Sequence, residues 1–352
     1  MASNKKIRSL TSSPAPCGKG NWLVIFIIIN LLFVDFINTN AHTITDMTGR
    51  KVTIPDHITR VIPYDNKSNS MLFAVAGNLM ICKARAMENP SLKFISKDFL
   101  RLREIDMHNV EEMLRLKPDF VLVSAFADED VSRYTAVSKQ TGIPFVIVDL
   151  ELMKLDKSFE FLGQLLGKKT EATTCVNLIR SIYADMEKYK KGKRASGKAY
   201  LANNADGLRT APATSNHAQV FDVMGIPNAA KGQLDAKGFS AVSMEQVLVW
   251  NPESIFAIGK AESSPYRTIL KSSLWRNVTA VKSKRVFYVP CEPYLWFDMP
   301  PSVNRLLSLI WFSDIFYGQP NEITKQKVMD FYRIIYKYSL TETEYKSLYM
   351  WK

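Results

Sequence analysis

The sequence predicts an α/β protein with two similar parallel-sheet lobes, one long helix that joins them, and a ligand cleft between the lobes. Three observations lead to this prediction. The chain contains an internal repeat at an offset of 134 residues, its apolar strand segments alternate with helices, and a long amphipathic stretch separates the two copies. The 352 residues are 47% hydrophobic and 23% charged, which excludes a disordered, a fibrous or a multi-span membrane protein.

Residues 1–41 have the three parts of a secretory signal peptide. A basic stretch precedes an apolar run over 22–34, and Thr39 and Ala41 supply small residues at the −3 and −1 positions of a cleavage site. As a helix this run covers only about 20 Å, whereas the hydrocarbon core of a bilayer is about 30 Å thick. We therefore expect cleavage and a periplasmic protein that begins at His42. An uncleaved membrane anchor is the alternative.

The internal repeat relates residues 109–123 to residues 243–257. Each copy opens on a capping box, in which Asn or Ser precedes Glu or Gln by three positions. A short helix with apolar residues at i and i+3 or i+4 follows, and Pro118 or Pro252 ends it. An apolar strand comes next in both copies. The two segments therefore predict two helix–strand units of the same design.

Neighbouring segments repeat in the same order. Residues 60–64 and 198–202 both read as strands that lead through a polar loop into a helix, and residues 145–149 match 286–290 in character. Strands that alternate with helices at this spacing predict parallel sheets flanked by helices. One continuous doubly wound sheet with chance similarity is the alternative to two lobes.

A long helix connects the two copies. After Thr170, a candidate cap, apolar residues recur every three or four positions from Cys175 to Tyr189. A helix of that length measures roughly 30 Å and forms a strut between the lobes. The predicted organisation is a signal peptide at 1–41, an N-terminal lobe at 42–165, the connecting helix at 166–192, a C-terminal lobe at 193–320 and a helical tail at 321–352.

Open parallel sheets bind ligands beyond the carboxyl ends of their strands. We therefore expect the loops after equivalent strands of both lobes to face the cleft. His217 follows such a loop and is a candidate metal ligand, since imidazole commonly binds metals; the alternative is a histidine at a helix start that bonds the backbone. Arg209 offers a bidentate contact to an anionic ligand, or else it braces its own loop.

Aromatic side chains complete the expected site. Tyr64 follows the first strand and either contacts the ligand or packs on its own loop. Tyr294 and Trp296 lie in the loop at 291–301, which is rich in large side chains and suits a planar or apolar ligand. The predicted ligand-binding residues are Tyr64, Arg209, His217, Tyr294 and Trp296, with His217 also the candidate metal ligand.

Catalytic motifs are missing from the sequence. The four histidines are scattered, and neither a His-Glu-x-x-His motif nor a Gly-x-Ser-x-Gly motif occurs. The basic segment 190–194 lacks the interleaved aromatic residues of a nucleic-acid site. Cys82, Cys175 and Cys291 form no Cys-x-x-Cys pair, which argues against a zinc site and leaves open whether two of them pair. We predict a protein that is no enzyme, has no cofactor of its own and binds no nucleic acid.

Several segments resemble one family of transport proteins. They are residues 43–55, both proline turns of the repeat, residues 297–307 and the tail segments 331–336 and 340–345. Together they resemble bacterial periplasmic substrate-binding proteins that serve ABC importers of ferric siderophores, haem and cobalamin. The closest resemblance is to a branch with iron-complex binders and a molybdate/tungstate binder, and it covers nearly all of the mature chain.

The resemblance implies a protein that captures a metal-containing small molecule and delivers it to a permease in the inner membrane. We expect a monomer. The excess of 46 basic over 34 acidic residues favours an anionic ligand, such as a ferric siderophore. Molybdate or tungstate, haem and cobalamin are alternatives within the class. An exported chelatase-like enzyme is an alternative of a second class, and a membrane-tethered scaffold or adhesion protein one of a third.

One departure from the family concerns docking. Family members carry a glutamate on each lobe, six residues before the glycine that closes the first helix, and this glutamate pairs with permease arginines. Here those positions hold Met71 and Gln219, neither of which is acidic. The sequence therefore does not assign the docking residues, with Asp222 and Glu245 as alternatives.

Overall fold

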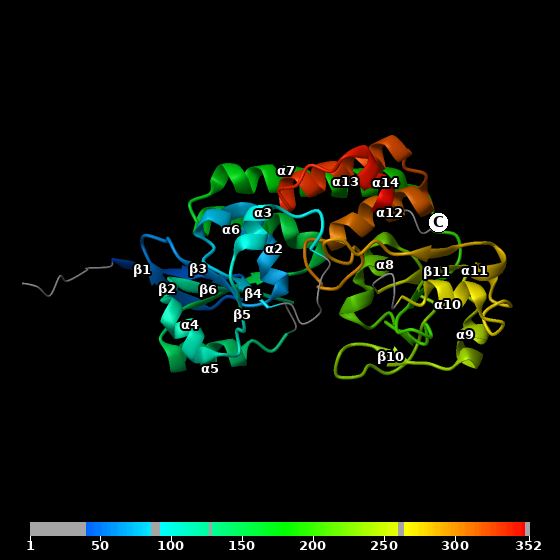
Figure 1. Ribbon diagram of the computed structural model, residues 1–352, viewed down its shortest axis with the longest axis horizontal. Coiled ribbons are helices and arrows are strands. Elements are labelled where there is room, and N and C mark those ends of the chain that lie inside the picture. Colours follow the sequence, from blue (N-terminus) through cyan, green and yellow to red (C-terminus); the bar gives the residue numbers. More distant parts are fainter. Residues whose placement is uncertain (1–39, 86–91, 127–128, 260–263, 349–352) are drawn as a thin grey trace, which may run out of the picture. The chain divides into compact units, whose positions relative to one another are not determined.

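The computed structural model describes residues 40–85, 92–126, 129–259 and 264–348 (Figure 1). Nearly all of the expected signal peptide lies outside these ranges. Residues 41–352 cluster as one compact unit. Within the described ranges, no helix combines the length and the apolar character that a membrane crossing requires.

The first lobe is built on a parallel sheet of three strands in the order β3-β6-β7. These strands are β3 (Val61–Pro63), β6 (Phe120–Ala125) and β7 (Phe145–Asp149), and nearly every residue in them is buried. Burial from both sides explains why they read as continuous apolar runs. The helices and turns of this lobe are α2 (Asn66–Ala76), η1 (Gly77–Leu79), α3 (Lys97–Arg101), α4 (Val110–Leu116), α5 (Ser132–Thr141), η2 (Leu152–Lys154) and α6 (Leu155–Leu165).

The second lobe repeats this sheet. Its strands β8 (Ala199–Ala202), β11 (Ser254–Ala257) and β12 (Val286–Tyr288) pair in parallel in the corresponding order, β8-β11-β12. The same strand order in both copies confirms the predicted fold class. The helices and turns of this lobe are η3 (Asn216–Ala218), α8 (Gln219–Met224), α9 (Met244–Trp250), α10 (Tyr266–Lys271), α11 (Thr279–Lys282) and α12 (Arg305–Tyr317).

The repeated helices α4 and α9 begin and end alike. Asn109 caps α4 through its side chain, and Ser243 caps α9 in a reciprocal capping box with Gln246. Capping by these side chains satisfies amide groups that have no partner within the helix. Each helix ends at a residue in the left-handed conformation directly before the proline, Lys117 in α4 and Asn251 in α9. The repeat seen in the sequence is therefore a repeat of backbone geometry.

The connecting helix is α7 (Lys169–Lys190), a helix of 22 residues. It packs against α2 and α6 of the first lobe and against α12 of the second (Figure 1). Its buried stripe includes Cys175, Ile179, Ile182 and Met186, the positions whose spacing predicted it. The same core therefore receives side chains from both lobes.

Smaller elements complete the fold. The helix α13 (Asn321–Ile335) packs on α7, α12 and α2. Within the described residues, Cys82, Cys175 and Cys291 form no disulfide bond. Burial raises the pKa of the Cys82 and Cys175 thiols to about 12, so both stay protonated and unreactive at neutral pH.

The remaining elements are the pairs β1 (Ala41–Thr45) with β2 (Lys51–Pro55), β4 (Lys83–Ala84) with β5 (Glu104–Ile105) and β9 (Arg209–Thr210) with β10 (Ser240–Ala241), and the helices α13 (Asn321–Ile335) and α14 (Glu342–Leu348).

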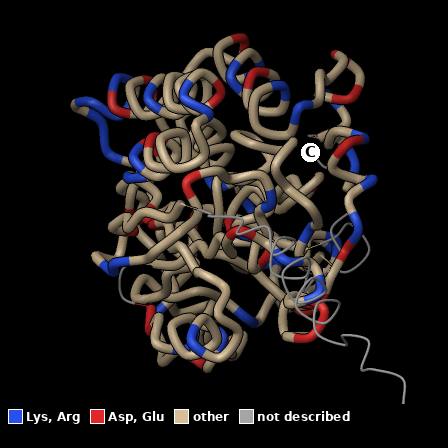
Figure 2. The backbone as a smooth tube through the Cα atoms, turned by 90° about the vertical axis from the view of Figure 1, so that its left-hand side faces the viewer, with Lys and Arg blue, Asp and Glu red and all other residues tan. Residues whose placement is uncertain are grey.

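The charged residues are mixed rather than separated. In the view of Figure 2, basic and acidic residues alternate over the helices and loops. Many of them form ion pairs on the surface, as Arg180 does with Asp156 and Glu160. In this view the basic residues are thus distributed over many segments of the chain. Exposed ion pairs of this kind contribute little to stability.

Candidate functional site

The two lobes meet at Arg305, the first residue of α12. Its guanidinium is fully buried. Nε donates to the Ser302 carbonyl at 3.3 Å, Nη1 donates to Gln219 Oε1 at 2.5 Å, and Nη2 donates to the Leu150 carbonyl. The guanidinium carbon also lies 5.3 Å from the centre of the Phe126 ring. Leu150 and Phe126 directly follow β7 and β6, so Arg305 reaches the carboxyl ends of first-lobe strands, where a ligand is expected.

Arg305 is a buried cation without a bonded counterion. Burial lowers the pKa of its guanidinium to about 10, against the opposing effect of the charges on Asp298 and Glu151. The group therefore remains charged at neutral pH. Among the described residues, no carboxylate lies within ion-pair distance of it. A buried charge is costly unless it is paired, so this arrangement is suited to an anion.

Gln219 extends the contact between the lobes. Its Oε1 also accepts a hydrogen bond from the Leu152 amide at 3.2 Å, and its Nε2 donates to Glu151 Oε1 at 2.6 Å. Ser302 adds a further contact, because its hydroxyl donates to the Lys67 carbonyl at 2.6 Å. These hydrogen bonds join the start of α8 to the segment after β7, and the loop before α12 to the start of α2.

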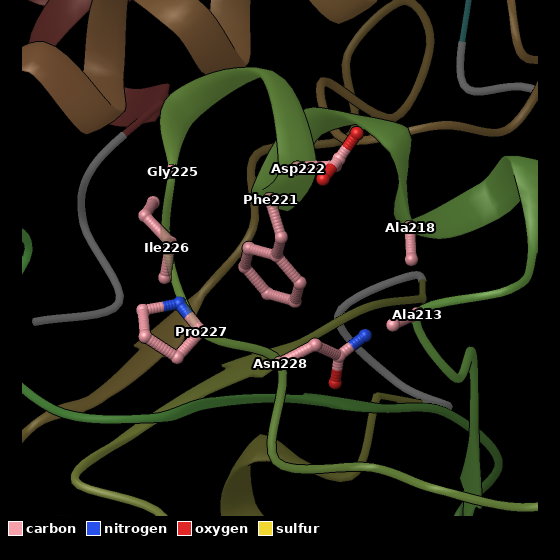
Figure 3. A pocket seen from close by; sticks show the side chains of 8 residues that line it. All are labelled: Ala213, Ala218, Phe221, Asp222, Gly225, Ile226, Pro227 and Asn228. Carbon is pink, nitrogen blue, oxygen red and sulfur yellow. The ribbon is translucent and has the colours of Figure 1, made fainter.

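The structure explains why the expected docking positions are not acidic. Met71 is completely buried in α2, and Gln219 is held in the junction by the hydrogen bonds described above. Neither side chain faces a partner. Asp222, one of the alternatives, is exposed on α8. It lines a pocket of about 280 Å³ together with Phe221, Ile226 and Pro227 (Figure 3).

The structure brings two predicted site residues together. The His217 ring stacks on Phe239 at 4.4 Å between ring centres, and the Arg209 guanidinium carbon lies 4.2 Å from the centre of the same ring. Arg209 also pairs with Asp235 at 2.8 Å. This pairing, with backbone hydrogen bonds, holds the pKa of Asp235 near 2. Arg209 thus braces the loop at 235–239, which was the alternative to ligand contact.

His217 is hydrogen-bonded at both ring nitrogens. Nδ1 bonds to Asp298 Oδ2, and Nε2 lies 3.0 Å from the Lys237 carbonyl. Both partners are acceptors, so both nitrogens donate and the ring is an imidazolium. Burial lowers the pKa of His217, but the hydrogen bond and charge of Asp298 outweigh burial and raise it overall. In this state neither nitrogen has a lone pair for a metal.

Metal binding by protein side chains alone has no further support in the structure. Within the described ranges, no three His, Cys, Asp or Glu side chains gather closely enough to hold a metal ion.

The aromatic candidates are placed differently. Tyr64 is half-buried, and its ring meets Tyr134 edge to face at 5.1 Å between centres. Tyr294 and Trp296 are 3% and 0% exposed. The Trp296 indole donates to the Tyr332 hydroxyl at 3.1 Å. These two rings therefore belong to the core and offer no accessible surface to a ligand. The sequence, in contrast, predicts that they contact the ligand.

Arg305, Gln219 and Asp298 are not among the site residues predicted from the sequence. Asp298 and Arg305 both lie in the stretch 297–307, which carried part of the family resemblance. The available signal was the presence of two opposite charges in a segment otherwise rich in apolar residues. Gln219 gave no such signal, because its position became meaningful only once the two lobes were placed together.

The repeated helices present a second candidate surface. Glu111 on α4 and Glu245 on α9 occupy equivalent positions, and both are exposed. One turn later, the equivalent residues Leu114 and Leu248 are 44% and 41% exposed. A hydrogen bond from its own amide at the helix start, and one from Ser243, hold the pKa of Glu245 below its usual value. Each lobe thus offers a carboxylate beside an exposed leucine.

The chain was compared with protein families and with known proteins. A family model described as a periplasmic binding protein matches residues 86–293. The molybdate-binding protein MolA of Haemophilus influenzae is 26% identical over 334 residues, which cover 84% of this chain and 91% of that protein. The iron(3+)-hydroxamate-binding protein YxeB of Bacillus subtilis is 23% identical over 282 residues, which cover 74% and 81%.

Solved structures share the fold. An ABC transporter solute binding protein from Sulfurospirillum deleyianum superposes with a TM-score of 0.78 at 24% identity, over 88% of this chain and 99% of the other. MolA of Haemophilus influenzae bound to molybdate superposes with a TM-score of 0.67 at 23% identity, over 85% and 99%. At this level of identity the likeness establishes architecture, and the ligand has to be argued from the residues of the junction.

Proposed function

The chain belongs to the periplasmic binding protein family, and on that premise we propose that it captures an anionic, metal-containing ligand where its lobes meet and delivers it to an ABC importer. The observation that carries the proposal is Arg305, a buried guanidinium that touches both lobes and has no bonded carboxylate among the described residues. Relatives named as binders of molybdate and of iron(3+)-hydroxamate support a ligand of this chemistry.

Arg305 would bind the ligand by exchanging a neutral partner for a charged one. Its present acceptors are the Leu150 carbonyl, the Ser302 carbonyl and the Gln219 amide oxygen. Hydrogen bonds from a guanidinium to an anionic oxygen are roughly twice as strong as those to neutral acceptors. A ligand oxygen that takes the place of a neutral acceptor would therefore gain affinity while it keeps both lobes engaged.

The predicted residues take supporting roles in this proposal. Arg209 and His217 hold the loop at 235–239 against the second lobe through Asp235 and the Lys237 carbonyl. Tyr64 remains a candidate contact at the end of β3. Tyr294 and Trp296 belong to the buried core, and they anchor the loop that leads to Arg305.

The repeated helices would dock the permease. Glu111 and Glu245 stand at equivalent positions of α4 and α9, so a permease with two similar subunits could meet both in the same way. The carboxylates would pair with permease arginines, which is the contact that the family resemblance implies. The exposed Leu114 and Leu248 would add apolar contact beside each carboxylate.

Native mass spectrometry of the mature protein from its own periplasm tests ligand capture. The protein is challenged with ferric siderophores, haem, cobalamin, molybdate and tungstate. We expect a one-to-one adduct with one of them, lost in R305Q and kept in R209Q, which removes an arginine of the same lobe that is paired with Asp235. An adduct that R305Q binds as well as the wild type would overturn the role of Arg305. Metal insertion into a porphyrin, followed optically, would instead support the chelatase-like alternative.

Ligand uptake by cells tests docking. E245K and E111K reverse one carboxylate each, and we expect each to lower uptake about tenfold while ligand affinity stays unchanged, because charge reversal at a docking surface opposes the partner. E322K on α13 is the matched control, since Glu322 is equally exposed and lies outside the repeated helices. Normal uptake by both variants would show that the permease binds elsewhere.

A further inference from the structure

Asp298 is a buried carboxylate that uses only one of its two oxygens. The side chain is 1% exposed. Oδ2 bonds to Nδ1 of His217, whereas Oδ1 has no hydrogen-bond partner within the described residues. Buried polar atoms in folded proteins are nearly always hydrogen-bonded, so an orphan of this kind calls for an explanation.

Asp298 can only accept a hydrogen bond at the free oxygen. Its partner His217 donates from both nitrogens, to Asp298 and to the Lys237 carbonyl, and is therefore a cation. Oδ2 accepts from Nδ1 of His217, and an aspartate carboxylate has acceptor oxygens and no donor. A group that satisfies Oδ1 must consequently bring its own N–H or O–H.

The free oxygen belongs to the same junction as Arg305. Asp298 lies in the loop that leads directly into Arg305 at the start of α12. In this loop the Leu295 amide donates to the Met299 carbonyl at 3.3 Å, and the Asn304 side chain amide donates to the Leu295 carbonyl. The charge of Asp298 is the largest effect of any neighbouring side chain on the pKa of Arg305, which it raises against burial.

Arg305 itself has unused donors. A guanidinium has five N–H groups, and three of them donate, to Ser302, Gln219 and Leu150. Two N–H groups thus remain on Arg305, and Asp298, whose charge acts on this guanidinium, keeps one carboxylate oxygen without a partner among the described residues. A ligand that complements this set presents anionic oxygens to the guanidinium and a hydrogen-bond donor to Asp298.

We propose that Asp298 is a specificity-determining residue, which selects an anion that carries its own hydrogen-bond donor and rejects a bare tetrahedral oxyanion. The inference rests on the proposed function and narrows its ligand to metal chelates with N–H or O–H groups beside the anionic oxygens. Molybdate and tungstate have only acceptor oxygens near neutral pH, and an oxygen of either would lie against Oδ1 without a proton between them. Sites built around a buried hydrogen-bonding group discriminate strongly against analogues that lack the matching group.

Exchange of Asp298 for asparagine tests this selection. The amide oxygen of D298N can keep the bond from His217, while the amide nitrogen presents a donor where Oδ1 presented an acceptor. The probes are ferric enterobactin and ferric bacillibactin, which are anionic and carry amide N–H groups, and molybdate and tungstate, which carry none. Titration calorimetry gives all four affinities for the mature wild-type protein and each variant.

We expect the wild type to bind at least one chelate at least tenfold more tightly than either oxyanion, and D298N to shift this ratio towards the oxyanions by at least tenfold. The control D98N makes the same exchange at an exposed aspartate of α3, outside the junction, so it should retain the wild-type preference. Tighter binding of molybdate than of both chelates by the wild type overturns the inference, as does an unchanged ratio in folded D298N or a wild type that binds none of the four.

The outcome is separable from failure of the proposed function. If D298N does not fold, as thermal unfolding would show, the wild-type ratio decides by itself. If the junction is not the ligand site at all, R305Q binds every probe as the wild type does, whereas a wrong assignment of Asp298 leaves the effect of R305Q intact.

Discussion

The two lobes share a scaffold and differ in what they attach to its third strand. In the first lobe, β7 leads into Leu150, which offers a backbone carbonyl to the junction. In the second lobe, β12 leads into the loop at 289–304, which brings Asp298 and the start of α12 with Arg305. The first lobe thus supplies backbone acceptors and the Glu151 carboxylate, whereas the second lobe supplies the buried charges of Asp298 and Arg305. The repeat provides two similar sheets, and the proposed ligand selection by Asp298 and Arg305 depends on residues of the second lobe.

Trp296 gives the sharpest test of what the second-lobe loop does. Its indole is fully buried, donates to Tyr332 and meets the Trp311 ring at 6.2 Å between centres. Truncation of a buried Trp to Ala typically costs roughly 3–5 kcal/mol, and we expect W296A to lower the free energy of unfolding by that amount in a denaturant titration. L274A, at a residue that is 63% exposed, is the control. If W296A kept its stability but lost ligand binding, Trp296 would be a ligand contact, as the sequence predicts.

The contrast between Trp296 and the repeated helices shows how far the sequence leads. Periodicity, capping residues and prolines predict α4, α9 and α7, because local geometry decides each of them. The same local rules cannot place Trp296, since a run of large side chains suits a buried loop and an aromatic cleft equally well. Nor can they find Gln219, whose partners Glu151 and Leu152 lie far away in sequence. Site residues that depend on the meeting of two lobes therefore need the structure.

The His217–Asp298 bond should make the second lobe sensitive to pH. The pKa of His217 is raised in the folded state, so its stabilising effect is full below the unfolded value near 6.5 and is lost as pH rises through the folded value. A hydrogen bond to a charged group contributes roughly 1.5–3 kcal/mol, and we expect H217N to lose stability of that order in acidic buffer. The difference from wild type should shrink as pH rises above the folded pKa. A difference independent of pH would show that His217 is not protonated in the folded protein.

The two helix caps compare the copies directly. Ser243 and Gln246 form a reciprocal capping box in α9, whereas in α4 Asn109 caps alone and Glu112 forms an ion pair with Arg103. Loss of an N-cap side chain costs about 1 kcal/mol. We expect N109A and S243A each to lower the free energy of unfolding by about this amount, because each removes the side chain that accepts from the third amide of its helix. The reciprocal bond runs from the Ser243 amide to the Gln246 side chain and is removed by Q246A instead; unchanged stability in Q246A would show that the reciprocal bond adds nothing.

The surfaces of α4 and α9 differ at one position that bears on docking. Arg115 of α4 corresponds to Val249 of α9, and Val249 is 82% exposed. The acidic patch of α4 is partly neutralised, since Arg103 and Arg115 both lie near Glu112, while the patch of α9 combines a carboxylate with Leu248 and Val249. Substitution at so exposed a residue should change stability by less than about 0.5 kcal/mol. We therefore expect V249S to fold and bind ligand as the wild type does and to lower uptake, whereas R115S should leave uptake nearly unchanged. Equal effects of V249S and R115S in the uptake measurement would mean that the two lobes dock alike, and that the asymmetry of the protein is confined to its ligand site.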